Sequence, residues 1–219
     1  GLRVSDPAQW PWLIELLETA DVDHVFIYMH IPSVDPMPGG TTGWSDPLEV
    51  DFFETLLAKT AERVESVYVF TGHVHGFARR ARDGVQYLTT AGAGSPLYMP
   101  PDRGGFFHYT VVTVSGDEVW YEVVPLLERI SVSAERTLLA PGDELQLSAT
   151  GTAPYGYVQF PLTYPAQVRW TVDDETVARI DAATGRLHAL APGRVVVTVE
   201  SGGLAASVEI DVIRADPDR

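Results

Sequence analysis

The stretch SVYVFTGHVHG, residues 66–76, decides how the first half of this 219-residue chain is organised. Its opening, SVYVFT, is short and rich in β-branched and aromatic residues, which predicts a buried strand. Two histidines, His73 and His75, follow directly, with a glycine on each side of the pair. Residues i and i+2 of an extended segment point the same way, so both imidazoles are expected to reach one crevice at the end of this strand.

A second apolar run, HVFIYMH at 24–30, predicts another buried strand, and it ends in His30. A proline- and glycine-rich loop follows at 31–45, and Asp46-Pro47 then signals the start of a helix that reaches about Val64. An earlier helix is expected over residues 7–20. Strands separated by a helix become neighbours in a sheet, and the carboxyl ends of such strands bind ligands. The order therefore brings His30 toward the other two histidines.

A histidine pair of this kind has an ordinary interpretation, as partly exposed loop residues. The flanking glycines Gly72 and Gly76, and His30 at an equivalent strand end, make a metal site the alternative, and the residues alone leave both interpretations open. Since the chain has no cysteine, any metal must bind to His, Asp, Glu or Asn. The remaining histidines are expected to be ordinary surface or strand residues: His24, His108 and His188.

Turn signals dominate the rest of the chain. Asp83-Gly84 and Ser115-Gly116-Asp117 each separate two strand-like runs and predict hairpins, closing near Pro125. From about Leu127, seven short strands alternate with turns, which is typical of a small β-sandwich. We therefore expect one domain at 1–126, a second at 127–213 and a tail at 214–219. The expected core of the sandwich is Trp170, Val177, Ile180, Leu187, Val197 and Val199.

Composition excludes several classes of function. The net charge is −15, from 30 acidic and 15 basic residues, which argues against binding to a nucleic-acid backbone. No apolar run approaches the roughly 20 residues that span a bilayer, so no membrane span is expected.

The histidine motifs carry a resemblance to a known family. FIYMHIP at 26–32 and VYVFTGHVHGF at 67–77 resemble the calcineurin-like metallophosphoesterases, within them the purple acid phosphatase-like and related secreted branches. YLTTAGAGSPLY at 87–98 is similar to a later segment of that family. The resemblance covers about residues 1–125 and implies an α+β or α/β fold, the C-terminal half of an αββα sandwich.

The family resemblance also implies a chemistry. Two metal ions, Zn, Fe or Mn, would act on a phosphate-ester substrate, with His30 and His73 on one metal and His75 on the other. Arg79, Trp44 and Gly94 are the candidate substrate-binding residues. Arg79 has an alternative place on the solvent face of a hairpin, and Gly94 in a plain turn. Residues 31–46 contain no histidine that would serve as general acid, so the catalytic acid is unassigned.

Part of the family pattern is missing. The family's DxH, GDxx and GNH segments, which supply the bridging aspartate, have no counterpart at the expected positions of this chain. Asp21-Val22-Asp23-His24 has the letters of a DxH segment, but it lies before the strand and not after it, and no GNH occurs. We therefore expect the chain to be the C-terminal part of a longer phosphoesterase, with the N-terminal half as its missing partner. Alone, it is expected to be inactive, or at best to bind one metal weakly.

Residues 127–213 resemble the bacterial Ig-like group 2 (BIG2) domain, on ISVSAERTLLAPGDELQLSAT at 130–150 and VRWTVDDETVARIDAATGRLHALAPGRVVVTVES at 168–201. The resemblance implies a secreted or cell-surface location and contact with cell wall or carbohydrate. The aromatic stretch 153–167 is either a binding loop or a cover for the first domain. The alternative function is a non-catalytic cell-surface binding or adhesion module, in which the phosphoesterase half is a degenerate scaffold.

Overall fold

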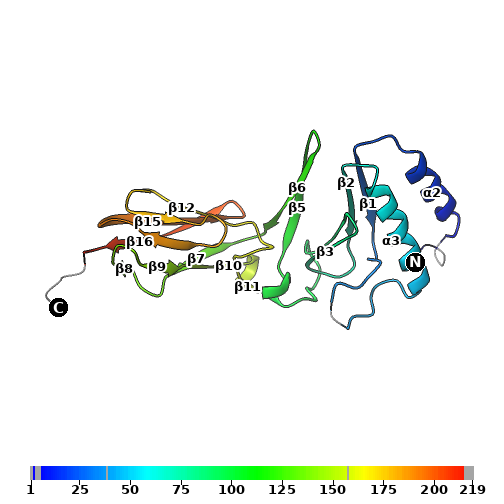
Figure 1. The fold of residues 1–219 in the computed structure, drawn as a ribbon. Coiled ribbons are helices and arrows are strands. Elements are labelled where there is room, and N and C mark those ends of the chain that lie inside the picture. The colour runs from blue at the N-terminus through cyan, green and yellow to red at the C-terminus, as the bar shows by residue number, and fades with distance from the viewer. Residues whose placement is uncertain (1, 3–5, 38, 157, 215–219) are drawn as a thin grey trace. The chain divides into compact units, whose positions relative to one another are not determined.

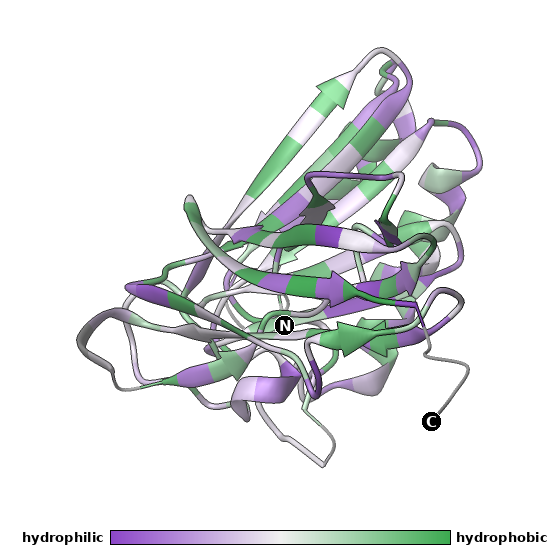
Figure 2. Ribbon diagram, turned by 90° about the vertical axis from the view of Figure 1, so that its left-hand side faces the viewer, coloured by the Kyte–Doolittle hydropathy of each residue, from purple (hydrophilic) through white to green (hydrophobic). Residues whose placement is uncertain are grey.

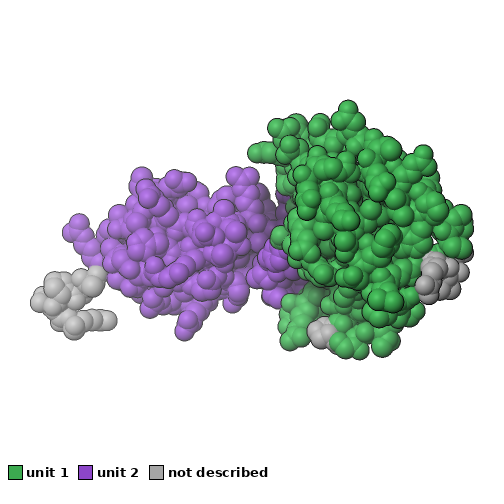
Figure 3. Space-filling model, turned by 45° about the vertical axis from the view of Figure 1, so that its right-hand side comes forward, with its two compact units in different colours: residues 1–121 green, residues 122–219 purple. Residues whose placement is uncertain are grey.

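The structure is a computed structural model that describes residues 2, 6–37, 39–156 and 158–214. The chain forms two compact units, Gly1–Tyr121 and Glu122–Arg219 (Figure 3). The first mixes two helices with a largely parallel sheet, and the second consists of β-strands. The expected mixed first half and all-β second half are thus confirmed. Apart from Arg214, the predicted tail lies outside the described residues.

The first unit contains α2 (Gln9–Thr19), β1 (His24–Met29), α3 (Pro47–Ala61), β2 (Ser66–Thr71), β3 (Phe77–Arg82), β4 (Val85–Thr90), a 3₁₀ turn η1 (Pro101–Arg103), β5 (His108–Ser115) and β6 (Glu118–Pro125). β1, β2 and β4 pair in parallel and β3 closes the sheet antiparallel, in the order β1-β2-β4-β3. Met29 lies opposite Thr71, so β1 and β2 end level with each other. The amide of Gly72 donates to the carbonyl of His30 at 3.0 Å and extends the pairing by one step.

The two helices begin where their sequences allow. The Asp46 side chain accepts from the amide of Leu48 and caps α3, as the Asp-Pro signal predicts. α2 starts at Gln9, two residues later than expected. Pro11 explains the shift, because a proline lacks an amide hydrogen and fits only the first turn of a helix.

The two faces of the sheet are covered differently. Both helices pack on one face, where Leu13, Phe53 and Leu57 meet Val67 and Val69 in a closed core (Figure 1). The β5–β6 hairpin lies on the opposite face (Figure 1). Aromatic side chains of that face stack on one another: Phe26, Tyr28, Tyr68 and Phe70. The hairpin is fixed there by hydrogen bonds, one from the Tyr68 hydroxyl to the Val119 carbonyl at 3.1 Å and one between His24 Nε2 and the Gly116 carbonyl at 2.8 Å.

The second unit contains β7 (Arg129–Ser133), β8 (Leu138–Leu139), β9 (Glu144–Gln146), β10 (Ser148–Thr152), a 3₁₀ turn η2 (Pro154–Gly156), β11 (Gln159–Pro161), β12 (Arg169–Val172), β13 (Ala178–Ile180), β14 (Arg186–Ala189), β15 (Gly193–Ser201) and β16 (Leu204–Val212). They form sheets of order β11-β10-β7, β12-β15-β16-β8 and β13-β14-β9. Hydrophilic and hydrophobic residues alternate along the strands (Figure 2). The single strand expected around residue 147 is two, because β9 pairs with β14 and β10 with β7.

The core of the second unit follows the prediction closely. Trp170, Leu187, Val197 and Val199 are almost completely buried, as is Val177 to a slightly smaller extent, while Ile180 is half-buried. The stretch 153–167 contributes to this core, because it carries β11 and the buried side chains Phe160, Leu162 and Ala166. Tyr164 is 66% exposed, and Tyr157 lies outside the described residues.

Candidate metal centre

His30 and His73 meet at the C-terminal ends of β1 and β2. His73 Nδ1 lies 3.1 Å from His30 Nε2, and the ring centroids are 5.0 Å apart. The level ends of the two strands produce this pairing, since each histidine follows its strand within two residues. The two ring nitrogens therefore face each other at hydrogen-bond distance, and the tautomers decide which of them donates.

The backbone of His73 is unusual. Its φ of +62° lies in the left-handed region, which a residue with a Cβ adopts rarely and at a cost of about 1–2 kcal/mol. The ring of this residue lies against His30. Such outliers persist where the surrounding structure holds them, often at functional sites.

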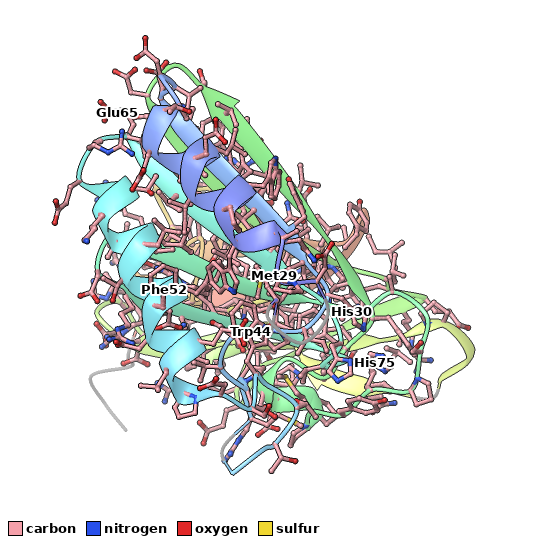
Figure 4. All side chains as sticks on the ribbon, turned by 90° about the vertical axis from the view of Figure 1, so that its right-hand side faces the viewer. Met29, His30, Trp44, Phe52, Glu65 and His75 are labelled. Carbon is pink, nitrogen blue, oxygen red and sulfur yellow. The ribbon has the colours of Figure 1, made fainter. Side chains whose placement is uncertain are left out.

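His75 takes a different environment. Its Nδ1 lies 2.7 Å from the carbonyl oxygen of Pro96, and its ring stacks on Tyr98 at 4.3 Å. His30 and His75 come from the same end of the sheet, opposite the end that carries Glu65 (Figure 4). Across the part of the chain that the structure describes, no group of three or more His, Asp or Glu side chains is arranged to hold a metal ion. The three predicted histidines therefore do not form one cluster: His30 and His73 lie against each other, and His75 contacts Pro96 and Tyr98 instead.

The geometry of the pair fits one metal ion. Two nitrogen ligands of a tetrahedral zinc ion, each about 2.0–2.1 Å from the metal, lie about 3.3 Å from each other. The 3.1 Å between His73 Nδ1 and His30 Nε2 is close to that separation. Neutral imidazole suits Zn, Fe and other borderline metals. A two-metal centre does not fit the described residues alone, because no carboxylate among them bridges the pair to His75.

Asp35, in the loop after β1, is a charged neighbour of His73 that the sequence did not single out. Burial alone would raise its pKa, yet hydrogen bonds from Thr42 and Met37 and the charge of His73 hold the pKa of Asp35 below its usual value. Its carboxylate accepts from the amides of Met37 and Thr42 at 2.8 and 2.7 Å, and from the Thr42 hydroxyl. Its oxygens are thus engaged in shaping the loop.

The candidate substrate residues are dispersed. Trp44 lies 5.1 Å from the ring of Phe53 and edge-on to Trp10, so it packs against the helices. Arg79 lines a cavity of about 250 Å³ together with Asp35. Gly94 has a φ of +139° and open space around it, in the segment between β4 and η1. A role for these residues in substrate binding stays a prediction.

His108 is a strand residue, the first of β5, and its side chain is buried. It is 1% exposed, with Nδ1 donating to the carbonyl of Phe106 and Nε2 3.2 Å from the hydroxyl of Thr90. Burial lowers the pKa of His108. A Cβ on Gly92 would lie 2.2 Å from its ring, so the glycine makes room for the buried imidazole. His24 joins β1 to the hairpin, and His188 is exposed on β14.

Residues 127–211 match the family model described as Bacterial Ig-like domain (group 2). This part of the chain therefore resembles the bacterial Ig-like domains. The match leaves the histidine-bearing first unit outside its range. Comparison with curated proteins gave no significant match. Among the described residues, no helix combines the length and the apolar composition that crossing a bilayer requires.

Two solved structures are similar to part of the chain. A mutant of intimin from EHEC O157:H7 is 15% identical, with a TM-score of 0.30, over 39% of this chain and 46% of that one. Domains 4 and 5 of the S-layer protein SbsC are 20% identical, with a TM-score of 0.33, over 51% of this chain and 69% of that one. The chain thus spans less than half of the length of the intimin structure.

Proposed function

We propose that the chain belongs to a secreted or cell-surface bacterial protein in which the Ig-like domain makes contact with cell wall or carbohydrate. The family match over residues 127–211 carries this proposal, because Ig-like sandwiches expose loops and strand edges around a rigid core. Adhesion or spacing at the surface is the role that such a module supplies.

A polar depression of about 400 Å³ on the Ig-like domain supports this proposal. It is lined by Gln167, Arg169, Glu200 and the turn between β15 and β16. Arg169 on β12 lies directly opposite Glu200 on the neighbouring strand β15, so a cation and an anion flank the same depression. Guanidinium, carboxylate and carboxamide groups together can donate to and accept from sugar hydroxyls.

NMR titration of the chain with solubilised cell-wall fragments tests this role. We expect shifts at the amides around Arg169 and Ser201, and weaker binding by at least fivefold in Arg169→Ala. Arg179→Ala is the matched control, because Arg179 is an exposed arginine on β13 away from the depression. Equal affinity of the two variants would count against this surface.

The histidine pair favours a second candidate function, metal-dependent phosphoester hydrolysis by the parent protein. The carrying observation is the 3.1 Å approach of His73 Nδ1 to His30 Nε2. These two residues would hold one Zn, Fe or Mn ion and His75 would contribute to a second. Bound metal would activate water and neutralise the charge of a phosphate ester. The remaining ligands, including a bridging carboxylate, would come from polypeptide outside residues 1–219.

The exposed flank of the sheet supports this second proposal. β1 is the end strand of its sheet, with no partner on its outer side among the described residues. Parallel sheets are normally covered on both faces, yet Tyr28 on β1 is 74% exposed and stacks on Phe70. An additional segment pairing along β1 would cover these rings and bring further ligands to the ends of the strands.

Calorimetric titration with Zn²⁺ tests the metal proposal on the 219-residue chain. We expect one weak site that disappears in the His30→Ala and His73→Ala variants, and no turnover of p-nitrophenyl phosphate. His188→Ala is the control, since His188 lies on β14 in the Ig-like domain. Zinc affinity unchanged by both substitutions would contradict the metal site, and turnover would contradict the need for further ligands.

A further inference from the structure

Pro96 and Tyr98, in the segment that follows β4, contact His75 at three points. The carbonyl oxygen of Pro96 lies 2.7 Å from His75 Nδ1, and the ring of Tyr98 stacks on the imidazole at 4.3 Å with 21° between the planes. The amide of Tyr98 donates to the backbone carbonyl of His75 at 2.9 Å. Both the ring and the backbone of the histidine are therefore held by residues 21 and 23 positions further along the chain.

Gly76 allows this segment to pack closely against the turn that carries His75. A Cβ added to Gly76 would lie 2.9 Å from the sulfur of Met99 and 3.0 Å from the carbonyl oxygen of Gly104. The glycine after His75 thus lets the 96–104 segment lie directly against the GHVHG turn. Gly72, at the other end of the turn, has only an ordinary 3.5 Å contact with the ring of His30.

The hydrogen bond to Pro96 decides where the proton of a neutral His75 resides. A carbonyl oxygen can only accept, so Nδ1 must carry the hydrogen, and the lone pair is then on Nε2. Histidines that bind metals commonly donate their second ring nitrogen to a carbonyl in this way, which fixes ring orientation and tautomer. Tyr98 is 53% exposed, so its ring contributes to His75 more than to the core.

The geometry points to Pro96 and Tyr98 as positioning residues that hold His75 as the Nδ1–H tautomer and present Nε2 to a divalent transition metal. The ligand role of Nε2 rests on the proposed phosphoester hydrolysis. The fixed tautomer does not depend on it, because it follows from contacts formed without any metal.

Long-range ¹H–¹⁵N NMR of the imidazoles, recorded on the metal-free 219-residue chain at a pH where His75 is neutral, tests this assignment. We expect one protonated nitrogen, Nδ1, in the native chain and in Tyr98→Phe, which retains the stacking ring. Tyr98→Ala frees the ring and is expected to give a mixture of tautomers. Tyr109→Ala, which removes another half-exposed aromatic ring on β5, is the control and leaves His75 unchanged.

Two results would overturn the assignment: a native His75 protonated mainly at Nε2, or a Tyr98→Ala spectrum identical to that of the native chain. A subsequent zinc titration separates this inference from the proposed function. If His75 is fixed at Nδ1–H but Zn²⁺ shifts no imidazole nitrogen, the metal proposal fails while the positioning of the ring stands.

Discussion

His73 combines a strained backbone with a contact between two imidazoles. The left-handed φ of +62° is unfavourable for any residue with a Cβ, and the side chain that it carries points at His30. Replacing histidine by alanine would keep the strain, whereas glycine would remove it. The comparison of the two variants therefore separates the backbone from the imidazole.

We expect His73→Gly to be more stable than His73→Ala by about 1 kcal/mol, because only glycine accepts this φ without a steric penalty. Both variants lose the same ring and the same candidate ligand nitrogen. Urea unfolding followed by tryptophan fluorescence measures the difference. A more stable alanine variant would show that the turn relaxes when the ring is absent.

At the scale of elements, a single carboxylate joins α3 to β3 and to the loop after β1. Glu54 is 3% exposed and accepts from the guanidinium groups of Arg80 and Arg82 and from the hydroxyl of Ser33. Burial alone would raise the pKa of Glu54, but hydrogen bonding and charge from Arg80, the Ser33 hydroxyl and the charge of Arg82 hold it below the ordinary value. Arg80 also lies over the ring of Tyr87 at 4.1 Å.

Glu54→Gln is expected to destabilise the first unit by about 2–3 kcal/mol at pH 7, less than for a fully buried pair because the arginines keep contact with water. Since the folded pKa is lowered, the contribution of Glu54 is complete above its ordinary value of 4.5 and is lost as the pH falls through the folded pKa. Native and variant chains should therefore converge in acid. Hydrogen exchange of α3 amides at several pH values measures this convergence.

The outer edge of β1, unpaired among the residues that the structure describes, favours self-association of the chain. Natural proteins protect edge strands with charged residues, prolines or bulges. The sequence of β1, HVFIYM, contains no proline and no Asp, Glu, Lys or Arg. We expect Tyr28→Lys to reduce association of the chain in sedimentation velocity at about 100 μM, without loss of fold. Leu48→Lys is the matched control, because Leu48 is 79% exposed on α3, which packs on the other face of the sheet. A native chain that is monomeric at this concentration would contradict the prediction.

At the scale of the whole molecule, the chain consists of two units with cores of their own. The first core is built by helix and sheet residues between Leu13 and Tyr87. In the second unit, buried side chains run from Val123 to Val212. Along the chain, the boundary between the units lies between Tyr121 and Glu122, within β6. The sequence predicted this boundary near residue 126.

The second unit is expected to fold alone. A fragment of residues 122–214 retains every strand from β7 to β16 and should unfold in one cooperative transition by circular dichroism. Trp170→Ala should cost this fragment about 3–5 kcal/mol, because the ring is 2% exposed and packs on Gly185. Arg169→Ala, at the exposed neighbouring position, should change its stability by less than about 0.5 kcal/mol.

Sequence periodicity predicted most elements of both units because it depends on local patterns, but it missed the short strands β8 and β11. The level ends of β1 and β2 and the approach of His30 to His73 follow from that order. The contacts of Pro96 and Tyr98 with His75 could not be predicted in this way, because no sequence pattern connects these residues. Asp35 was missed for the same reason: its place beside His73 depends on the path of the 31–45 loop.

The hydrogen bond between His24 and Gly116 connects positions 92 residues apart. The β5–β6 hairpin itself needs only neighbours in the chain, and hairpins of this kind form within about 1–10 μs. Parallel pairing of β1 with β2 must first close a loop of some forty residues, so it is the slower event. We therefore expect the hairpin to form before the sheet against which it docks.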